Sequence, residues 1–163
     1  MTEEELKELY AQVLELSHNI PATDRLDQPQ ATVTMVSPLC GSQITIDLDL
    51  DGETVRGFGQ KVRACTLGAA AASIVGARIV GCSADDLREL RTRMRGMLKD
   101  DGPAPEGEWS ALGVLEPARD LISRHGSIML IFDAVAEALD EIQGGRPATR
   151  APERKGIPDT VRA

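Results

Sequence analysis

The sequence predicts an α+β fold: a two-layer domain in which a three-stranded antiparallel sheet packs against helices. Residues 44–50 alternate Ile or Leu with Thr or Asp, which is the pattern of a strand with one buried face and one wet face. Asp51-Gly52 follows as a hairpin-turn signal, and a return strand is predicted from about Thr54 to Lys61. Longer segments on both sides carry apolar residues at helical spacing and are expected to form the second layer.

The third strand and the helices are predicted from local patterns around this hairpin. Residues 31–36 alternate small or polar side chains with Val33 and Met35, which predicts a strand. Polar caps followed by acidic residues favour helix starts, because they satisfy free N–H groups and the positive end of the helix dipole. Four helices are expected: from Thr2 to near Asn19, after Cys65, after Ser83 and after His125.

Three further expectations concern the helical layer. The first helix is expected to pack on the body through Leu6, Leu9, Tyr10, Val13 and Leu14. The third carries an arginine run that is expected to be a solvated face: Arg88, Arg91, Arg93 and Arg95. An irregular segment anchored by Trp109 and Leu115 is expected to lead into the last helix.

Composition and charge narrow the function classes. The chain has 163 residues, of which 42% are apolar, enough for the core of one compact domain. Its formal charge of −8 argues against nonspecific nucleic-acid binding, which needs a basic surface. The absence of a long apolar run argues against membrane insertion or export. Three cysteines at unrelated spacings fit a reducing cytoplasm better than a disulfide framework.

The chain divides into a domain at residues 1–143 and a tail at residues 144–163. The tail holds two adjacent glycines and three prolines, and its five basic residues outnumber its two acids. This composition is typical of a disordered segment, so we expect a disordered basic tail after an acidic domain.

Two cysteines lie where local chemistry would make a thiol available. Cys40 sits in a turn before the predicted hairpin, between Pro38, which fixes φ, and Gly41, which permits a bend. Cys65 opens a helix, where free N–H groups and the nearby Arg63 favour the thiolate. The hairpin runs out and back, so Cys40 and Cys65 are expected to approach each other. Buried cysteines also serve as small hydrophobes, so spacing alone leaves a structural role open.

The helix after Cys65 separates that thiol from the third cysteine. About 15 helical residues span about 22 Å, so Cys82 is expected to lie at the wrong end of the helix to share a site. Gly68 and Gly76 cost this helix about 1 kcal/mol each relative to Ala. Either close approach of another segment or simple tolerance explains them.

A family resemblance adds to this pattern. Pro-x-Cys-Gly before a strand hairpin, a cysteine opening an alanine-rich helix, and His125 before the last helix together resemble the iron–sulfur cluster assembly scaffold family, which comprises IscU, SufU and the N-terminal domain of NifU. The similarity extends from Leu9 to about Leu139. The acidic stretch at 100–108 is more similar to SufU than to IscU, and the Leu-Pro-Pro-Val-Lys motif of IscU is not present.

The resemblance implies a role without catalysis, as a scaffold or sulfur acceptor in iron–sulfur cluster assembly. Cys40 and Cys65 would be thiolate ligands or sulfur acceptors, and His125 would be a third ligand or a proton donor. The cargo would be iron, an iron–sulfur cluster such as [2Fe–2S], or zinc, since thiolates suit all three. The implied partners are a cysteine desulfurase and apo iron–sulfur acceptor proteins.

Two departures from the family pattern leave alternatives open. Ser42 stands where the family has an aspartate after Cys-Gly, and Gly126 stands where it has a third cysteine. The chain could therefore be a zinc-dependent accessory of sulfur transfer similar to SufU, or a metal-free regulatory homologue of the scaffold. No Ser-His-Asp spacing or phosphate-binding glycine loop points to an unrelated enzyme.

Overall fold

The fold is seen in a computed structural model, which describes residues 2–39 and 41–144. It contains three strands, four α-helices and two 3₁₀ segments. In chain order they are α1 (Glu3–His18), β1 (Ala31–Val36), β2 (Gln43–Asp51), β3 (Thr54–Arg63), α2 (Thr66–Arg78), α3 (Ala84–Lys99), η1 (Gly107–Asp120), η2 (Ile122–Arg124) and α4 (His125–Gly144).

The strands form one antiparallel sheet in the order β1-β2-β3. Ile46, at the centre of β2, lies opposite Val33 of β1 and Gln60 of β3. The β2–β3 turn is a tight hairpin in which Gly52 has a φ of 65°, a region that glycine enters without strain. The predicted hairpin and third strand are therefore confirmed.

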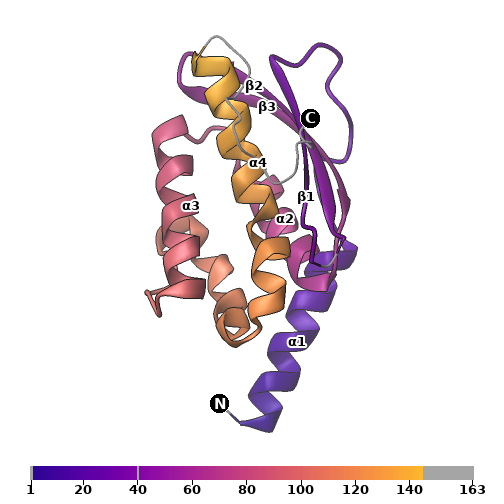
Figure 1. Ribbon diagram of the computed structural model, residues 1–163, viewed down its shortest axis with the longest axis vertical. Helices are drawn as coiled ribbons and strands as arrows, with labels where there is room; N and C mark the ends of the chain where they lie inside the picture. Colours follow the sequence, from indigo (N-terminus) through magenta and orange to yellow (C-terminus); the bar gives the residue numbers. More distant parts are fainter. Residues whose placement is uncertain (1, 40, 145–163) are drawn as a thin grey trace.

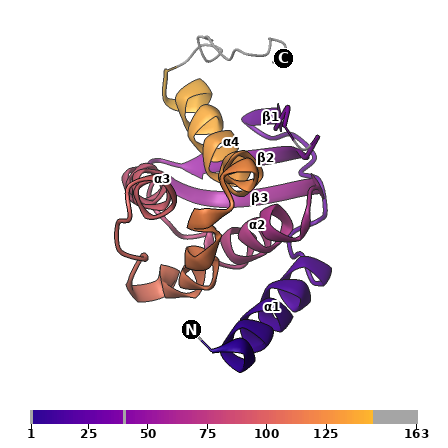
Figure 2. The same ribbon diagram turned by 60° about the horizontal axis from the view of Figure 1, so that its bottom comes forward.

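The helices cover one face of this sheet and make the second layer, as Figures 1 and 2 show. α4 packs on β1 and β2, while α2 packs against β3 and α4. α3 lies outside α4, and α1 lies along α2. The core between the layers includes Ile46, Ile74 and Ile131, all fully or almost fully buried. The predicted two-layer α+β fold is thus confirmed.

The second face of the sheet is covered in part, whereas a wet face was predicted for β2: Thr45 and Asp49 are half-buried, and Asp47 between them is buried. Asp47 is fully buried there, because residues 21–30 cross that face. Its carboxylate accepts hydrogen bonds from the guanidinium of Arg25, the backbone N–H of Leu26 and the hydroxyl of Thr32. Gly59 of β3 permits this crossing, since a Cβ there would clash with the carbonyl of Asp24.

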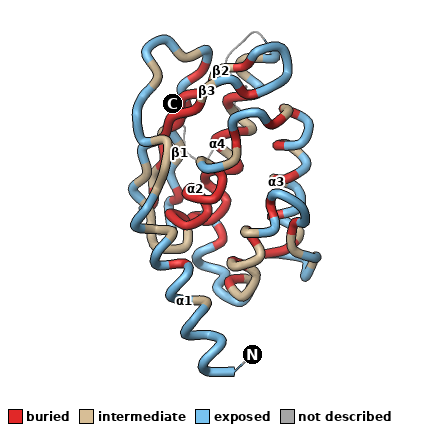
Figure 3. The backbone as a smooth tube through the Cα atoms, turned by 180° about the vertical axis from the view of Figure 1, so that it is seen from behind, coloured by how far each residue is buried: buried red, intermediate tan, exposed pale blue. Residues whose placement is uncertain are grey.

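α1 begins as predicted but packs differently. Thr2 and Glu5 form a reciprocal capping box, which satisfies two of the free N–H groups at the helix start. Val13 is the buried residue of this helix. Leu6, Tyr10 and Leu14 are exposed, so the prediction that they pack on the body is wrong. Figure 3 shows α1 as largely exposed beside the buried α2.

The arginines of α3 were predicted to be a solvated face, and three of them instead reach α4. Arg88 pairs with Asp140, and both Arg91 and Arg95 approach Asp133. All five side chains are partly exposed, so these ion pairs are expected to contribute little to stability.

The segment before α4 is more regular than predicted. Residues 107–120 form the 3₁₀ helix η1, in which Trp109, Leu112 and Leu115 are buried. α4 then continues to Gly144, one residue past the predicted domain end, and the expected disordered tail at 145–163 lies outside the described residues. Within the described part of the chain, no helix has the length and apolar character that crossing a membrane requires.

Candidate functional site: the Cys65 pocket

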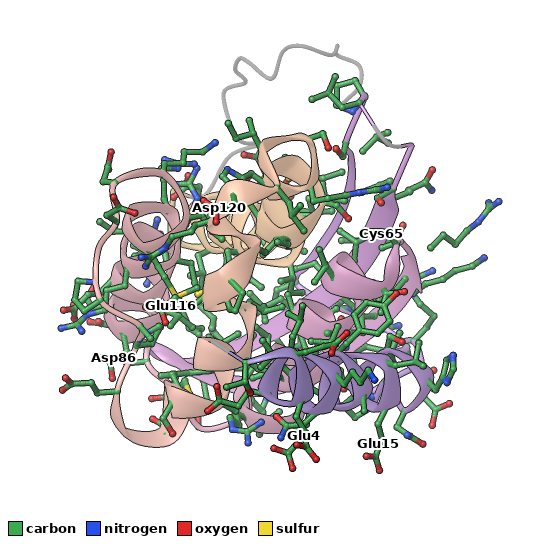
Figure 4. The ribbon with its side chains drawn as sticks, turned by 90° about the horizontal axis from the view of Figure 1, so that it is seen from below. Glu4, Glu15, Cys65, Asp86, Glu116 and Asp120 are labelled. Atoms are coloured by element: carbon green, nitrogen blue, oxygen red, sulfur yellow. The ribbon has the colours of Figure 1, made fainter. Side chains whose placement is uncertain are left out.

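Cys65 is the N-cap residue of α2, at the end of β3. Figure 4 labels it at the start of α2, on the side of the molecule where this helix meets the sheet. Its side chain is partly buried, and it is a free thiol. The predicted position at a helix start is confirmed.

Two buried serines from distant segments surround Cys65. Ser127 in the first turn of α4 places its Oγ 3.3 Å from the Cys65 Sγ. The Ser127 hydroxyl lies 2.9 Å from the Oγ of Ser42, to which it donates. Ser42 Oγ in turn accepts the backbone N–H of Cys65 at 3.3 Å. The three residues therefore form a closed ring of contacts that joins the start of β2, the start of α2 and the start of α4. We call it the hydroxyl ring.

The electrostatics of this pocket favour the thiolate. Burial by itself would raise the pKa of Cys65, but the hydrogen bond shared with Ser127, the N–H groups of Gly68 and Leu67, and the positive charge of Arg124 outweigh it. The net result is a lowered pKa, which raises the fraction of nucleophilic thiolate near neutral pH. The predicted effect of the helix start on the Cys65 pKa is therefore borne out. The positive charge that helps to lower this pKa is that of Arg124, whereas Arg63 was predicted.

His125, the third predicted ligand, is buried at the first position of α4. Its Nε2 lies 3.1 Å from the carbonyl oxygens of both Ala118 and Arg119. Carbonyls only accept, so this nitrogen carries the proton. In the neutral ring Nδ1 then holds the lone pair, and Nδ1 is buried with no hydrogen-bond partner among the described residues. An imidazole fixed by backbone carbonyls with its other nitrogen available is the usual setting of a metal ligand.

The remaining predicted ligand, Cys40, lies outside the described residues, and so does its expected approach to Cys65. The turn on either side of it is closed by hydrogen bonds from Ser37 N–H to the Ser42 carbonyl and from Gly41 N–H to the Ser37 carbonyl, each 2.8 Å. Gly126 faces this turn, since a Cβ on it would lie 2.9 Å from Ser37 Oγ.

Cys82 has a different environment. It is buried beyond the far end of α2, and its S–H donates to the carbonyl of Arg78. Burial raises its pKa to about 11, with Glu108 and Asp86 adding to the effect. The prediction that Cys82 lies at the wrong end of the helix is confirmed.

Ser42 is visible in the sequence as a departure from the family pattern, whereas the role of Ser127 beside Cys65 was not predicted. The signal that could have found Ser127 is Gly68: a Cβ there would clash with Ser127 Oγ and lie 2.9 Å from the Ser127 carbonyl. Close approach of α4, and not simple tolerance, therefore explains the glycine at position 68. Close approach of β3 likewise explains Gly76, where a Cβ would clash with the amide nitrogen of Gln60.

The donor atoms around Cys65 are hydroxyls, one thiol and backbone N–H groups. Within residues 2–39 and 41–144, no group of three His, Cys, Asp or Glu side chains is arranged to hold a metal ion. The Nδ1 lone pair of His125 fits a ligand role, whereas the neutral hydroxyls of Ser42 and Ser127 are poor ligands for soft metals. The pocket is therefore suited to reactions of the Cys65 thiolate that need no bound metal ion.

Comparison with known proteins places this architecture in a family. No protein-family model and no curated protein matches the chain. Among solved structures, the chain is similar to a nitrogen-fixing NifU-like protein (N-terminal) from Brucella abortus, with 38% identity over 85% of this chain and 97% of that chain, and a TM-score of 0.82.

Two more distant structures share the fold. A hypothetical protein is 19% identical over 82% of this chain and 98% of its own, with a TM-score of 0.75. A protein assigned as an iron–sulfur cluster assembly scaffold for the SUF system of Fervidobacterium islandicum is 13% identical over 78% of this chain and 93% of its own, with a TM-score of 0.73. The resemblance predicted from the sequence is thus confirmed, and the chain belongs to the family of IscU, SufU and NifU N-terminal domain-like proteins.

Proposed function

We propose that this chain serves iron–sulfur cluster assembly as a scaffold or sulfur acceptor, and that Cys65 is its central thiol. The observation that carries the proposal is the hydrogen-bonded, partly exposed Cys65 at the start of α2, whose pKa is lowered. Such a thiol can bind soft ions or attack a sulfur atom at neutral pH. The membership of a scaffold family supports the same role.

Cys40 and His125 would complete the site with Cys65. The orphaned Nδ1 of His125 supports a ligand or proton-donor role for that ring. The cargo would be iron, an iron–sulfur cluster such as [2Fe–2S], zinc or sulfane sulfur. Three ligands fall short of the four cysteines of stable clusters, so any bound cluster would be labile and suited to transfer.

The role implies two kinds of partner: a cysteine desulfurase that supplies sulfur, and apo iron–sulfur proteins that receive the product. We assign no catalysis to the chain itself. A reducing compartment such as the cytoplasm would keep its thiols available, in keeping with the free state of Cys65 and Cys82.

A second candidate is a metal-free regulatory homologue of the scaffold. The observation that favours it is the hydroxyl ring, because Ser42 and Ser127 offer Cys65 hydrogen bonds and no soft ligand. Such a protein would bind a desulfurase through the scaffold surface and carry no cargo. A SufU-like zinc accessory of sulfur transfer would instead require tight zinc binding.

The test is cargo loading of anaerobically purified protein. Wild type is incubated separately with iron and sulfide, with zinc, and with a cysteine desulfurase plus L-cysteine, and bound metal and sulfur are measured by elemental analysis and mass spectrometry. We expect wild type to hold at least one of these cargoes. Cys40→Ala or Cys65→Ala should abolish loading, and His125→Ala should weaken it.

Cys82→Ala is the matched control, since Cys82 is buried at the far end of α2. Equal loss on mutating Cys82 would show that the site is elsewhere. Full loading of a Cys40/Cys65 double variant would remove the acceptor hypothesis. A wild-type protein that takes no cargo yet changes the rate of a desulfurase would establish the regulatory candidate.

A further inference from the structure

Ser127 is the α4 side chain that contacts the Cys65 sulfur. It is 1% exposed, and Ser42 is 3% exposed, so neither hydroxyl can turn to bulk water. A buried hydroxyl needs hydrogen-bond partners, and Ser127 finds them in Cys65 Sγ and Ser42 Oγ. The contact is therefore a fixed feature of the pocket.

Backbone packing holds Ser127 in this place from both sides. Gly68 lets the first turn of α2 lie directly against the Ser127 hydroxyl, where any Cβ would clash. Gly126, the preceding residue, packs on Ser37 of the turn that also carries Ser42. Ser127 has no room to move away from the sulfur without separating these segments.

We propose that Ser127, held by Ser42, is the positioning residue for Cys65, and that this hydroxyl pair makes the pocket accept sulfane sulfur in preference to a metal ion. The inference rests on the proposed function, because it selects one of the cargoes named there. A hydroxyl can donate a strong hydrogen bond to an anionic sulfur, whereas it is a weak ligand for zinc or iron.

The step that Ser127 serves is a sulfur transfer. The Cys65 thiolate attacks the outer sulfur of a persulfide or polysulfide, so that a new S–S bond forms at Cys65 Sγ and the S–S bond of the donor breaks. The donor leaves as a thiolate or a shorter polysulfide, and the proton of the outer sulfur stays on the transferred atom. No external oxidant or reductant is needed. Ser127 has one hydroxyl proton, which it donates to Ser42 Oγ while Cys65 is a neutral thiol. When Cys65 is a thiolate, that proton turns to Sγ, 3.3 Å away, where it can orient the attacking sulfur and then bond to the persulfide.

The first experiment measures the rate at which Cys65 takes up sulfur from inorganic polysulfide at fixed neutral pH, by mass spectrometry of the full-length protein and its Cys65 peptide. Ser127→Ala should slow uptake about tenfold or more, since a hydrogen bond to a charged sulfur is lost. Ser127→Thr, which keeps the hydroxyl, should restore most of the rate. Ser42→Ala should give an intermediate loss, because it removes the partner that holds Ser127.

Ser73→Ala is the matched control for this series. Ser73 is also a buried serine, on α2 itself, but its hydroxyl bonds to the Asn19 carbonyl away from the pocket. Its removal can lower stability and should leave sulfur uptake at Cys65 unchanged. Circular dichroism and thermal unfolding of each variant verify that rates are compared between folded proteins.

The second experiment tests cargo preference with Co²⁺ alone as a spectroscopic probe. Ser127→Cys replaces the hydroxyl by a thiol of similar shape beside Cys65 Sγ. Tetrahedral thiolates on one ion lie about 3.8 Å apart, from bonds of about 2.3 Å. The present 3.3 Å between Oγ and Sγ is close to that spacing. The variant should bind Co²⁺ at least tenfold more tightly than wild type and show thiolate-to-cobalt charge-transfer absorption.

Two results would overturn the inference. Unchanged polysulfide uptake by Ser127→Ala would show that the hydroxyl does not position Cys65, even if wild type accepts sulfur as proposed. Co²⁺ binding by wild type as tight as by Ser127→Cys would show that the hydroxyl does not select against metal. Failure of wild type to take up any sulfur would instead count against the acceptor role itself, so the two failures are distinguishable.

Discussion

Asp47 shows at the scale of one residue how this fold departs from its sequence pattern. Alternation along β2 predicts a wet carboxylate, yet its side chain is 0% exposed. Residues 25, 26 and 32 donate hydrogen bonds to the buried carboxylate and so offset its loss of hydration. Alternation along the strand cannot reveal these donors, because they lie 15 or more positions away. Burial would raise the pKa of Asp47, but the hydrogen bonds from Arg25, Thr32 and Leu26 outweigh it, so the net pKa is lowered.

Replacing this carboxylate should destabilise the protein in a pH-dependent way. Asp47→Asn is expected to lower the free energy of unfolding by about 2 kcal/mol at neutral pH, because it removes a charged acceptor from buried donors. The folded pKa is below the unfolded value of about 3.9, so this stabilisation is present above that pH and is lost as pH falls through the folded pKa. Urea unfolding between neutral and acidic pH measures it.

Asp51→Asn is the matched control, since Asp51 is exposed at the end of the same strand. It should change unfolding by at most a few tenths of a kcal/mol. A difference between wild type and Asp47→Asn that stays constant down to pH 2 would show that the carboxylate charge is not the source of the stabilisation.

At the residue scale, the sequence could predict the chemistry of Cys65 but not its neighbours. A thiol before an alanine-rich helix is visible in the chain, and so is its expected shift toward thiolate. Ser127 lies 62 positions away from Cys65, and only the packing of α4 on α2 brings them together. Serine is common at helix starts, so its residue type alone does not predict a contact with Cys65.

At the scale of elements, α2 depends on its glycines for packing and not for flexibility. Gly68 and Gly76 lie where a Cβ would clash with Ser127 and Gln60. Gly96, within α3, has nothing within 4 Å of its Cβ position. Gly68 and Gly76 are therefore required by close packing, whereas Gly96 only lowers the stability of its helix. Helix propensity alone cannot distinguish the two cases.

This contrast gives a paired prediction. Gly96→Ala should stabilise the protein by about 0.5–1 kcal/mol, the gain in helix propensity at an open site. Gly68→Ala should destabilise it by more than that amount, since α2 and α4 must move apart, and should also slow sulfur uptake at Cys65. Chemical denaturation of both variants measures the signs. A stabilised Gly68→Ala protein would show that the contact between α2 and Ser127 is loose.

The strands were predicted more accurately than the surfaces of the helices. Residues 31–36 and the hairpin at Asp51-Gly52 follow from short-range patterns, and both are confirmed. The exposure of Leu6, Tyr10 and Leu14 could not be predicted, because α1 carries more apolar side chains than its contact with α2 can bury. Spacing identifies an amphipathic helix but not the width of its partner surface.

On the scale of the whole molecule, the layered fold separates two thiols of opposite character. Cys65 lies at the start of α2 with its pKa lowered, and Cys82 lies beyond the other end with its pKa raised to about 11. α4 packs across β1, β2 and α2, and this packing creates the environment of Cys65. It also covers α2, the helix that separates Cys65 from Cys82. A chain with three cysteines thus acquires position-specific reactivity from its topology.

The order in which the cysteines of the native protein react tests most directly whether Cys65 is the reactive thiol. The folded chain is treated with limiting iodoacetamide at about pH 7, and labelling of the Cys65 and Cys82 peptides is followed over time by mass spectrometry. Unfolded protein in denaturant serves as the control, in which the two thiols should react at similar rates. We expect Cys65 to be labelled at least tenfold faster than Cys82 in the folded state. Equal labelling, or faster labelling of Cys82, would contradict the assignment of Cys65 as the reactive thiol.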